Sequence, residues 1–272
     1  MLRNTRRVIQ CLIRFIKFVN KDFWLHLCCQ TMLVKTNGIV LHHIKYTDSS
    51  LIVTIYTERF GRKTFIIHNA RGRGSSPKAN ILQPLFLLEL DIYFKPSRDI
   101  QQIKEFKNLV PFHTIPFNII KSSVAIFLAE ILYKTIREEE SNFKLYEFLF
   151  NSIQFLDITS AGIPNFHILF LLQLSKYLGF YPENNFNKQN RIFDLQNGVF
   201  VPATPFHPHY VDERLSRILK ELLQINYNNL NSIKMKSEER YRLLVKILEY
   251  YQLHTEGLGD VKSLQVLKEV FH

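Results

Sequence analysis

The spacing of apolar residues divides the chain into two parts, and the first part has the pattern of a β-structure. Between Met32 and about Lys107 the apolar residues occur in short runs rich in β-branched and aromatic side chains. Turn-forming clusters such as Thr47–Ser50 and Phe60–Lys63 separate the runs. The predicted strands are Gly38–Tyr46, Leu51–Thr57, Thr64–His68, Leu85–Phe94 and Ile100–Phe106. Five short strands in so short a segment predict a small closed barrel of OB-fold size.

From Pro116 onward the apolar positions recur about every 3.6 residues, which predicts amphipathic helices. The predicted helices are Ser122–Glu140, Lys144–Leu156, Asn165–Leu178, Asp212–Gln224, Ser237–His254 and Ser263–Phe271. The first carries an apolar stripe of Ile126, Phe127, Leu128, Ile131, Leu132 and Ile136. Residues 181–208 are irregular, with a predicted hairpin of Ile192–Leu195 and Val199–Val201. The fold class is therefore α+β and multi-domain: a five-stranded OB-fold β-barrel over residues 32–110, followed by an all-α helical domain over residues 111–272.

The first 31 residues do not fit either pattern. The stretch Val8–Val19 is apolar but carries Arg14 and Lys17, so it is too short and too charged to span a bilayer. A second methionine, Met32, directly precedes the first strand pattern. We expect Met32 to be the true start and residues 1–31 to be an extension upstream of it. The alternative is an amphipathic helix at a membrane surface, with Phe15, Phe18 and Trp24 on one side.

The net charge of +11 is unevenly distributed along the chain. Residues 32–110 hold twelve Lys/Arg and six acids, and residues 1–31 hold six Lys/Arg and one acid. Residues 111–272 hold seventeen of each, so the positive excess lies wholly before the helical domain. A basic excess confined to one domain favours a polyanion-binding surface, although a basic surface can also serve solubility alone.

The basic residues concentrate in the window 59–78, which contains six Lys/Arg, three glycines and no acid. Arginine offers paired donors to phosphate oxygens, and glycine lets the backbone approach them closely. Tyr56, Phe60 and Phe65 border the window, and bases could stack on any that face a groove. The alternative is a solvated basic loop with aromatic residues in the core. We predict phosphate contact by the basic residues as a group.

The sequence lacks a convergent set of catalytic residues, which predicts a protein that is not an enzyme. No phosphate-binding, nucleophile-elbow or zinc-protease motif occurs. All three cysteines lie in the first 31 residues, which excludes a cysteine zinc site or disulfide framework in the folded body. The pairs His42–His43 and His207–His209 are expected to be structural or solvated, and the acids Glu138–Glu140 are expected to be solvated at a helix end.

The order of these features resembles the RecO family of recombination mediators. The matching stretches are Thr36–Leu41, Arg71–Lys78, Leu82–Leu85, Leu178–Pro182 and Lys262–Leu267. Each stretch is weak alone, but their order and spacing are fairly specific. The resemblance covers residues 32–272.

The resemblance implies a protein that binds single- and double-stranded DNA and anneals complementary strands. Its implied partners are RecR, RecF and RecA, together with the C-terminal tail of single-strand-binding protein, which would dock on the helical domain. Many family members carry a four-cysteine zinc site in the segment matching residues 183–203, and this segment has no cysteine here. We therefore expect no cofactor and a degenerate zinc-finger-like segment at about 181–208. Packing of Phe186, Ile192, Phe193, Leu195, Val199 and Phe200 would hold this segment.

On the OB surface, the expected DNA contacts are Lys35, Arg59, Arg62, Lys63, Arg71, Arg73 and Lys78. The expected location is the bacterial cytoplasm, at the nucleoid, with no membrane partner. The sequence is also compatible with two other functions. The same basic loop would serve an RNA- or ribosome-associated OB protein, and the helical domain could hide an unrecognised enzyme site.

Overall fold

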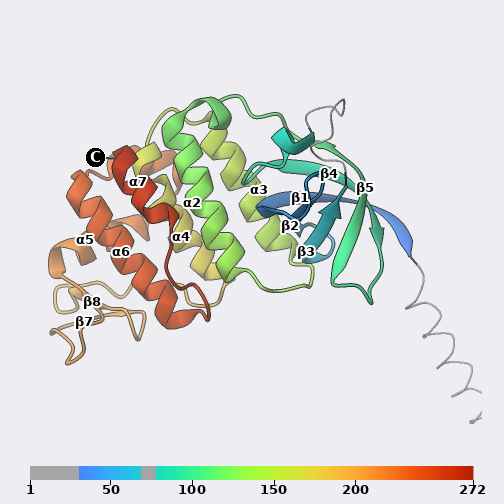
Figure 1. Cartoon of the computed structure of the whole chain (residues 1–272). Helices are drawn as coiled ribbons and strands as arrows, with labels where there is room; N and C mark the ends of the chain where they lie inside the picture. Colours follow the sequence, from blue (N-terminus) through green and yellow to red (C-terminus); the bar gives the residue numbers. More distant parts are fainter. Residues whose placement is uncertain (1–30, 69–77, 272) are drawn as a thin grey trace, which may run out of the picture.

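The computed structural model describes residues 31–68 and 78–271, without the side chains of residues 78 and 79. The chain forms a β-barrel joined to a larger helical domain, and the α2 and α3 helices lie against the barrel (Figure 1). The expected N-terminal extension and most of the Arg/Gly loop, including Arg71 and Arg73, lie outside the described residues.

The predicted five-stranded barrel is confirmed. Its strands are β1 (Met32–Lys45), β2 (Leu51–Thr57), β3 (Gly61–Ile67), β4 (Leu87–Phe94) and β5 (Ile100–Asn108). The strand order is β1-β2-β3-β5-β4, and pairing of β4 with β1 closes the barrel. The β3–β5 pair is parallel, and the other four pairs are antiparallel. Strand β1 begins six residues earlier than the hydrophobic run predicts, because its first residues pair with β4 although several of them are exposed.

The buried side chains of the barrel interior are aliphatic apart from Phe65. Val40, Val53, Ile55, Phe65 and Leu90 are all completely buried there. Gly38 faces the same interior, where an added Cβ would lie 2.5 Å from Ile55 Cγ2. On β1, Ile39 and Leu41 instead belong to the core of the helical domain. Strand β1 is therefore buried on both faces in this part, which explains its continuous apolar run.

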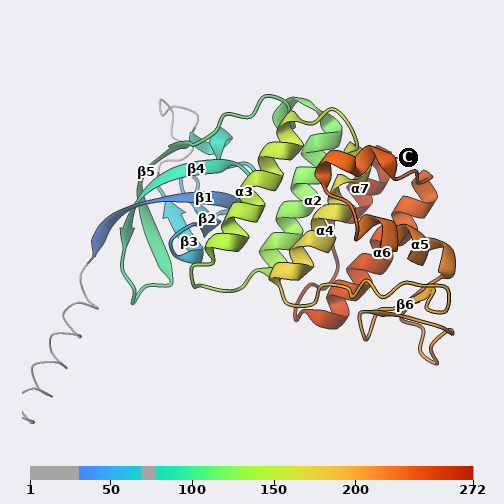
Figure 2. The ribbon, with the colours of Figure 1, turned by 180° about the vertical axis from the view of Figure 1, so that it is seen from behind.

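The helical domain contains α2 (Ile119–Thr135), α3 (Phe143–Ile158), α4 (Ile163–Tyr177), α5 (Glu213–Leu222), α6 (Ser237–His254) and α7 (Ser263–Phe271). Short 3₁₀ turns lie at η1 (Lys78–Ile81), η2 (Ile115–Phe117) and η3 (Tyr227–Ser232). Seen from behind, α2 and α3 lie on the barrel side of the helical domain, and α5 and α6 lie at the far end (Figure 2). Within the described ranges, no helix is long and apolar enough to cross a membrane.

Two expectations about the first long helix are wrong. It ends at Thr135 rather than at Glu140, because Ile136 adopts an extended conformation with φ −86° and ψ 110°. Glu138–Glu140 therefore lie in the α2–α3 connection. Ile126 is not part of the buried stripe, since its exposed fraction is 47%, whereas Phe127 and Ile131 are fully buried.

The irregular segment near residues 181–208 forms a small sheet, as the predicted hairpin required. Strands β6 (Ile192–Asp194) and β7 (Val199–Val201) pair antiparallel, and a third strand, β8 (Tyr210–Val211), adds to β6. Phe193 and Phe200 are buried with their ring centroids 5.0 Å apart. The Asn185 side chain bonds both the N–H and the C=O of Phe200, at 2.7 and 3.0 Å. Packing and side-chain hydrogen bonds therefore hold this segment together.

The two domains are joined by a set of hydrogen bonds that we call the hairpin clasp, between residues 58–63 and residues 133–141. The N–H of Arg62 donates to the Glu138 carbonyl at 3.0 Å, and the Ser141 hydroxyl donates to the Glu58 carbonyl at 2.8 Å. Gly61 has a φ of +62°, and a Cβ there would collide with the Glu140 carbonyl. The glycine thus permits close approach of the two backbones.

Candidate nucleic-acid interface

Lys35 and Arg59 lie together on the outside of the barrel. Lys35 is on β1, and Arg59 is in the β2–β3 connection. The Arg59 Nη1 group donates to the Lys35 carbonyl at 3.2 Å, which ties the connection to β1. The Lys35 side chain is 75% exposed, and its Nζ lies 3.9 Å from an Asp91 carboxylate oxygen. Such an exposed, long ion pair contributes little energy, so the lysine remains available to a phosphate.

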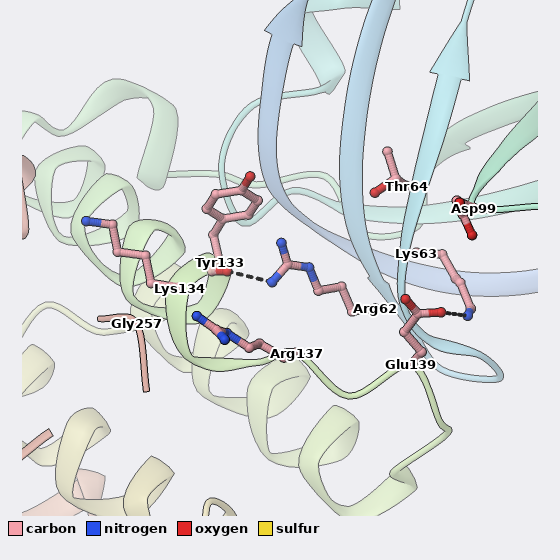
Figure 3. A pocket seen from close by; sticks show the side chains of 9 residues that line it. All are labelled: Arg62, Lys63, Thr64, Asp99, Tyr133, Lys134, Arg137, Glu139 and Gly257. Carbon is pink, nitrogen blue, oxygen red and sulfur yellow. Dashed lines mark hydrogen bonds and ion pairs between the residues drawn. The ribbon is translucent and has the colours of Figure 1, made fainter. Parts of the chain in front are cut away.

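Arg62 and Lys63 instead face the helical domain (Figure 3). The Arg62 Nη1 group donates to the carbonyls of Tyr133 and Ile136, both at 2.8 Å. Its guanidinium carbon also lies 4.6 Å from the centre of the Tyr133 ring. Lys63 Nζ lies 2.6 Å from Glu139 Oε2, and that hydrogen bond and charge hold the pKa of the Glu139 carboxyl below its usual value. The predicted cations therefore fall into two groups rather than one.

Three of the predicted DNA contacts have no described side chain. Arg71 and Arg73 lie outside the described residues. Lys78 begins η1, but its side chain is not described. A DNA-binding role for all seven cations stays a prediction.

The aromatic residues that border the basic window are mostly inaccessible to bases. Tyr56 and Phe65 are completely buried, so stacking of bases on them is excluded. Phe60 is half-buried and stacks on Phe94 with ring centroids 4.1 Å apart. The exposed ring nearest to Lys35 in the sheet is Tyr93, which pairs with Leu33 on β1. Strand alternation places Leu33 and Lys35 on the same outer face of the barrel.

A cleft of about 510 Å³ opens between the barrel and the helical domain. We call it the junction cleft. It is lined by Arg62, Lys63, Thr64, Asp99, Tyr133, Lys134, Arg137, Glu139 and Gly257. The sequence did not single out Lys134 or Arg137 as candidate site residues, because the helical domain has no net charge excess. Only the tertiary fold brings these two residues next to Arg62 and Lys63. Their positions three residues apart at the end of α2 were the only signal that the sequence offered.

The acidic run Glu138–Glu140 is exposed, as expected, but it lies in the α2–α3 connection rather than at a helix end. The Glu139 side chain is 75% exposed and also pairs with Lys63 across the domain boundary. The ion pair itself could not be predicted, because Lys63 lies 76 residues away from Glu139 in the sequence.

The paired histidines occupy separate environments. The His42 ring packs against Tyr133 at 4.5 Å, and burial lowers the pKa of His42, with His43 and Arg62 adding to the effect. His209 Nδ1 lies 2.7 Å from Glu249 Oε1, and His207 Nε2 lies 3.4 Å from Asp194 Oδ1. Each histidine of that pair thus faces a single carboxylate.

The donor set of a zinc site is not present in the zinc-finger-like segment. Residues 183–203 contain no cysteine. In the ranges that the structure describes, no three His, Cys, Asp or Glu side chains are grouped so that they could hold a metal ion. Residues 183–203 therefore do not offer the donors of the four-cysteine zinc site that the resemblance implies.

The arrangement defines a class of protein in which a five-stranded OB-type barrel with exposed cations precedes an all-helical domain. Residues 32–112 match the family Recombination protein O N terminal, and residues 116–265 match Recombination protein O C terminal. The DNA repair protein RecO of Phocaeicola vulgatus is 40% identical over 240 residues, which is 88% of this chain and 100% of that relative. The proteins of the same name from Bacteroides fragilis and Porphyromonas gingivalis are 41% and 31% identical, with the same coverage of both chains. The chain belongs to the RecO family of DNA repair proteins.

Proposed function

We propose that the chain is a recombination mediator that binds single- and double-stranded DNA on its barrel and anneals complementary strands. The observation that carries the proposal is the confinement of the positive excess to residues before the helical domain, in a chain whose RecO-type barrel presents exposed Lys35 and Arg59. Arg71, Arg73 and Lys78 extend this basic surface in the sequence. Phosphate neutralisation by such a set gives salt-dependent, largely sequence-independent binding.

Its partners are proposed on family grounds. The protein works with RecR and RecF to load RecA onto strands covered by single-strand-binding protein, whose acidic tail docks on the helical domain. It acts by binding rather than by catalysis, at the bacterial nucleoid in the cytoplasm. The resemblance supports these assignments, and the absence of a recognised catalytic motif agrees with them.

We also propose that the protein functions without zinc. Support comes from the missing cysteines of residues 183–203 and from the Phe193–Phe200 packing that holds the segment. Metal analysis of protein purified without chelators tests this. Stoichiometric zinc in the purified protein would contradict it.

The decisive experiment is strand annealing on DNA covered with single-strand-binding protein, without added nucleotide. We expect the wild-type protein to anneal the covered strands. The double variant Arg71→Ala/Arg73→Ala should bind DNA more weakly, with the salt dependence of log affinity lower by roughly 0.7 to 0.9 for each phosphate that is no longer neutralised. The matched control is Arg191→Ala/Arg217→Ala, which removes two positive charges that both pair with Glu213 on the helical domain.

Failure of the wild-type protein to anneal covered strands would reject mediation. Unchanged affinity of the Arg71/Arg73 variant across a salt series would reject the basic loop as the binding surface. Competition between single-stranded DNA and RNA of equal length decides the remaining alternative. Preference for RNA would favour an RNA-associated OB protein.

A further inference from the structure

The junction cleft carries more positive than negative charge. Its lining includes four cations and two carboxylates. Lys63 is paired with Glu139, and Lys134 Nζ lies 2.9 Å from Glu130 Oε1. Arg62 and Arg137, by contrast, form no ion pair with any residue that the structure describes. Counting the four lining cations against Asp99, Glu139 and Glu130 leaves a net charge of +1, because Asp99, the second lining carboxylate, offsets one of the two guanidinium charges.

Arg62 is held in place without being neutralised. Both of its side-chain hydrogen bonds leave from Nη1, and they end on the carbonyls of Tyr133 and Ile136 at the C-terminal end of α2. Those carbonyls fix the guanidinium plane but carry only partial negative charge. Within the described residues, Nε and Nη2 have no hydrogen-bond acceptor. The group thus keeps donors and a full charge for a ligand.

Arg137 is positioned by the connection between α6 and α7. Gly257 in that connection has a φ of +80°, and a Cβ there would collide with the Arg137 guanidinium. The glycine therefore leaves the room in which the arginine side chain lies. Figure 3 shows Arg62 reaching from the barrel and Arg137 from the end of α2 into the same cleft.

The chemistry of the cleft suits the phosphate of a nucleic-acid backbone better than a base. Guanidinium groups offer paired N–H donors that match two phosphate oxygens. The aromatic lining residue, Tyr133, is already covered by Arg62 at 4.6 Å and by the His42 ring at 4.5 Å. A base that entered the cleft would therefore compete with these two side chains for the Tyr133 ring, whereas a phosphate would not.

We propose that the junction cleft is a phosphate-binding site in which Arg62 and Arg137 hold the backbone of a DNA strand that also lies on the barrel. The inference rests on the proposed DNA-binding function and extends it to the helical domain. Arg59, which is exposed, lies three residues before Arg62 in the same hairpin. Three residues span at most about 10 Å, a length that roughly three stacked nucleotides cover. One strand can therefore contact Arg59 and enter the cleft.

The test compares Arg137→Ala with Arg217→Ala in DNA binding over a salt series. Both variants remove one exposed arginine from the helical domain, but Arg217 lies on α5 and pairs with Glu213. We expect Arg137→Ala to lower the salt dependence of log affinity for single strands by about 0.7, the value for one phosphate contact. Arg217→Ala should bind like the wild type. Equal effects of the two variants, or no effect of Arg137→Ala, would overturn the inference.

A second variant should raise DNA affinity instead of lowering it. Glu139→Gln removes one of the two carboxylates that line the cleft and frees Lys63, so DNA affinity should rise several-fold at low salt. Lower or unchanged affinity would overturn the inference, because an anion site must respond to the loss of a neighbouring negative charge. Far-ultraviolet circular dichroism checks that each variant is folded.

Failure of the inference is distinguishable from failure of the proposed function. If wild-type protein binds no DNA, the function itself is wrong. If wild-type protein binds DNA, Arg71→Ala/Arg73→Ala weakens it and Arg137→Ala does not, the barrel binds DNA and the cleft does not.

Discussion

Neighbouring cations of the same hairpin serve different purposes. Arg59 is exposed and touches the barrel, whereas Arg62 reaches to the end of α2. Residue type and local spacing in the sequence do not distinguish the environment of Arg59 from that of Arg62. The difference arises because Arg59 lies in the β2–β3 connection beside β1, whereas Arg62 lies on β3 beside the connection that follows α2. The prediction that all basic residues of the window share one surface is therefore too simple.

At the residue scale, we predict that Tyr93 is a stacking surface for single-stranded DNA. The ring is 39% exposed and pairs in the sheet with the exposed Leu33, two residues from Lys35. Stacking of one base on an aromatic ring contributes about 1–3 kcal/mol. Tyr93→Ala should weaken binding of single strands about tenfold, as measured by fluorescence anisotropy, and should change duplex binding little, because paired bases are not free to stack.

Two variants control this prediction. Tyr93→Phe keeps the ring and should bind like the wild type. Tyr46→Ala removes another exposed ring, 60% exposed, just beyond the other end of β1, and should also have little effect. An equal loss in single-strand and duplex binding for Tyr93→Ala would contradict stacking.

A second residue-scale prediction concerns His167, which is completely enclosed between α4 and its neighbours. The ring packs 5.4 Å from Phe271 and 5.9 Å from Phe127. Burial, together with the positive charge of Arg240, lowers the pKa of His167 to about 3, whereas an unfolded histidine has a pKa near 6.5. Because the unfolded state binds the proton first, the unfolding free energy should fall as pH drops from 6.5 towards 3, by up to about 1.4 kcal/mol per pH unit.

Urea unfolding at pH 7 and pH 5 measures this effect. Carboxylates contribute little between pH 7 and pH 5, so the pH dependence reflects histidines, and His42, whose pKa burial also lowers, adds to it in the same direction. His167→Gln should flatten the pH dependence. His113→Gln, which alters an exposed histidine, is the matched control. The same slope in His167→Gln and wild type would show that this residue does not control acid stability.

At the scale of elements, the last helix is capped by a residue from another helix. Glu130 on α2 accepts hydrogen bonds from the N–H groups of Lys262 and Ser263, at 3.0 and 2.8 Å, and from the Ser263 hydroxyl at 2.6 Å. The two N–H groups lie at the start of α7, where backbone donors have no acceptor within the helix. The Lys262–Leu264 stretch, which resembles the family, is thus the point where α7 is fixed to α2.

We predict that Glu130→Gln destabilises the protein at neutral pH. Burial alone would raise the pKa of Glu130, but hydrogen bonds from Ser263, Lys134 and the Lys262 N–H bring it to about 2. The folded pKa lies below the unfolded value, so the stabilisation is present above about pH 4.5 and is lost as pH falls towards 2. The variant should lose about 2 kcal/mol of unfolding free energy at pH 7.

Chemical denaturation at pH 7 and pH 3.5 checks both the size and the sign. The difference between variant and wild type should shrink at the lower pH. Glu269→Gln is the control, because Glu269 is exposed and accepts a hydrogen bond from Gln265 on the same helix rather than from another element. A difference that is constant with pH would mean that the carboxylate charge is not responsible.

Most helices and strands could be predicted from the sequence, and the errors occur where contacts between distant segments decide the structure. The barrel strands and helices such as Ser237–His254 were found because their burial follows their own periodicity. The end of α2 was misplaced because Ile136–Glu140 have helix-forming side chains, yet Arg62 occupies the carbonyls at which the helix ends. The junction cleft could not be predicted, since its lining comes from segments that are far apart in the chain.

At the scale of the whole molecule, the hairpin clasp links the domain with the charge excess to the larger neutral domain. Arg62, Lys63 and Ser141 all take part, and most of their partners are backbone carbonyls. Such a link sets the relative orientation of the barrel and α2. The width of the junction cleft therefore depends on backbone contact as well as on charge.

A substitution at Gly61 separates that backbone contact from the charges. Gly61→Ala adds a single methyl group where the Glu140 carbonyl already lies, at a φ of +62° that disfavours other residues. We expect a loss of roughly 1–3 kcal/mol in unfolding free energy, because the strained backbone must shift away from residues 138–140. Hydrogen exchange should accelerate at the Arg62 amide, which donates to Glu138.

DNA binding by Gly61→Ala tests whether the hairpin clasp holds the junction cleft in place. All positive charges remain, so binding of a strand short enough to lie on the barrel should be nearly unchanged. A longer strand that also enters the junction cleft should bind more weakly. The control is Gly179→Ala, since Gly179 also has a positive φ, of +88°, but has nothing within 4 Å of an added Cβ. If Gly61→Ala and Gly179→Ala destabilise the protein equally, the effect comes from local backbone strain, and the clasp does not couple the two domains.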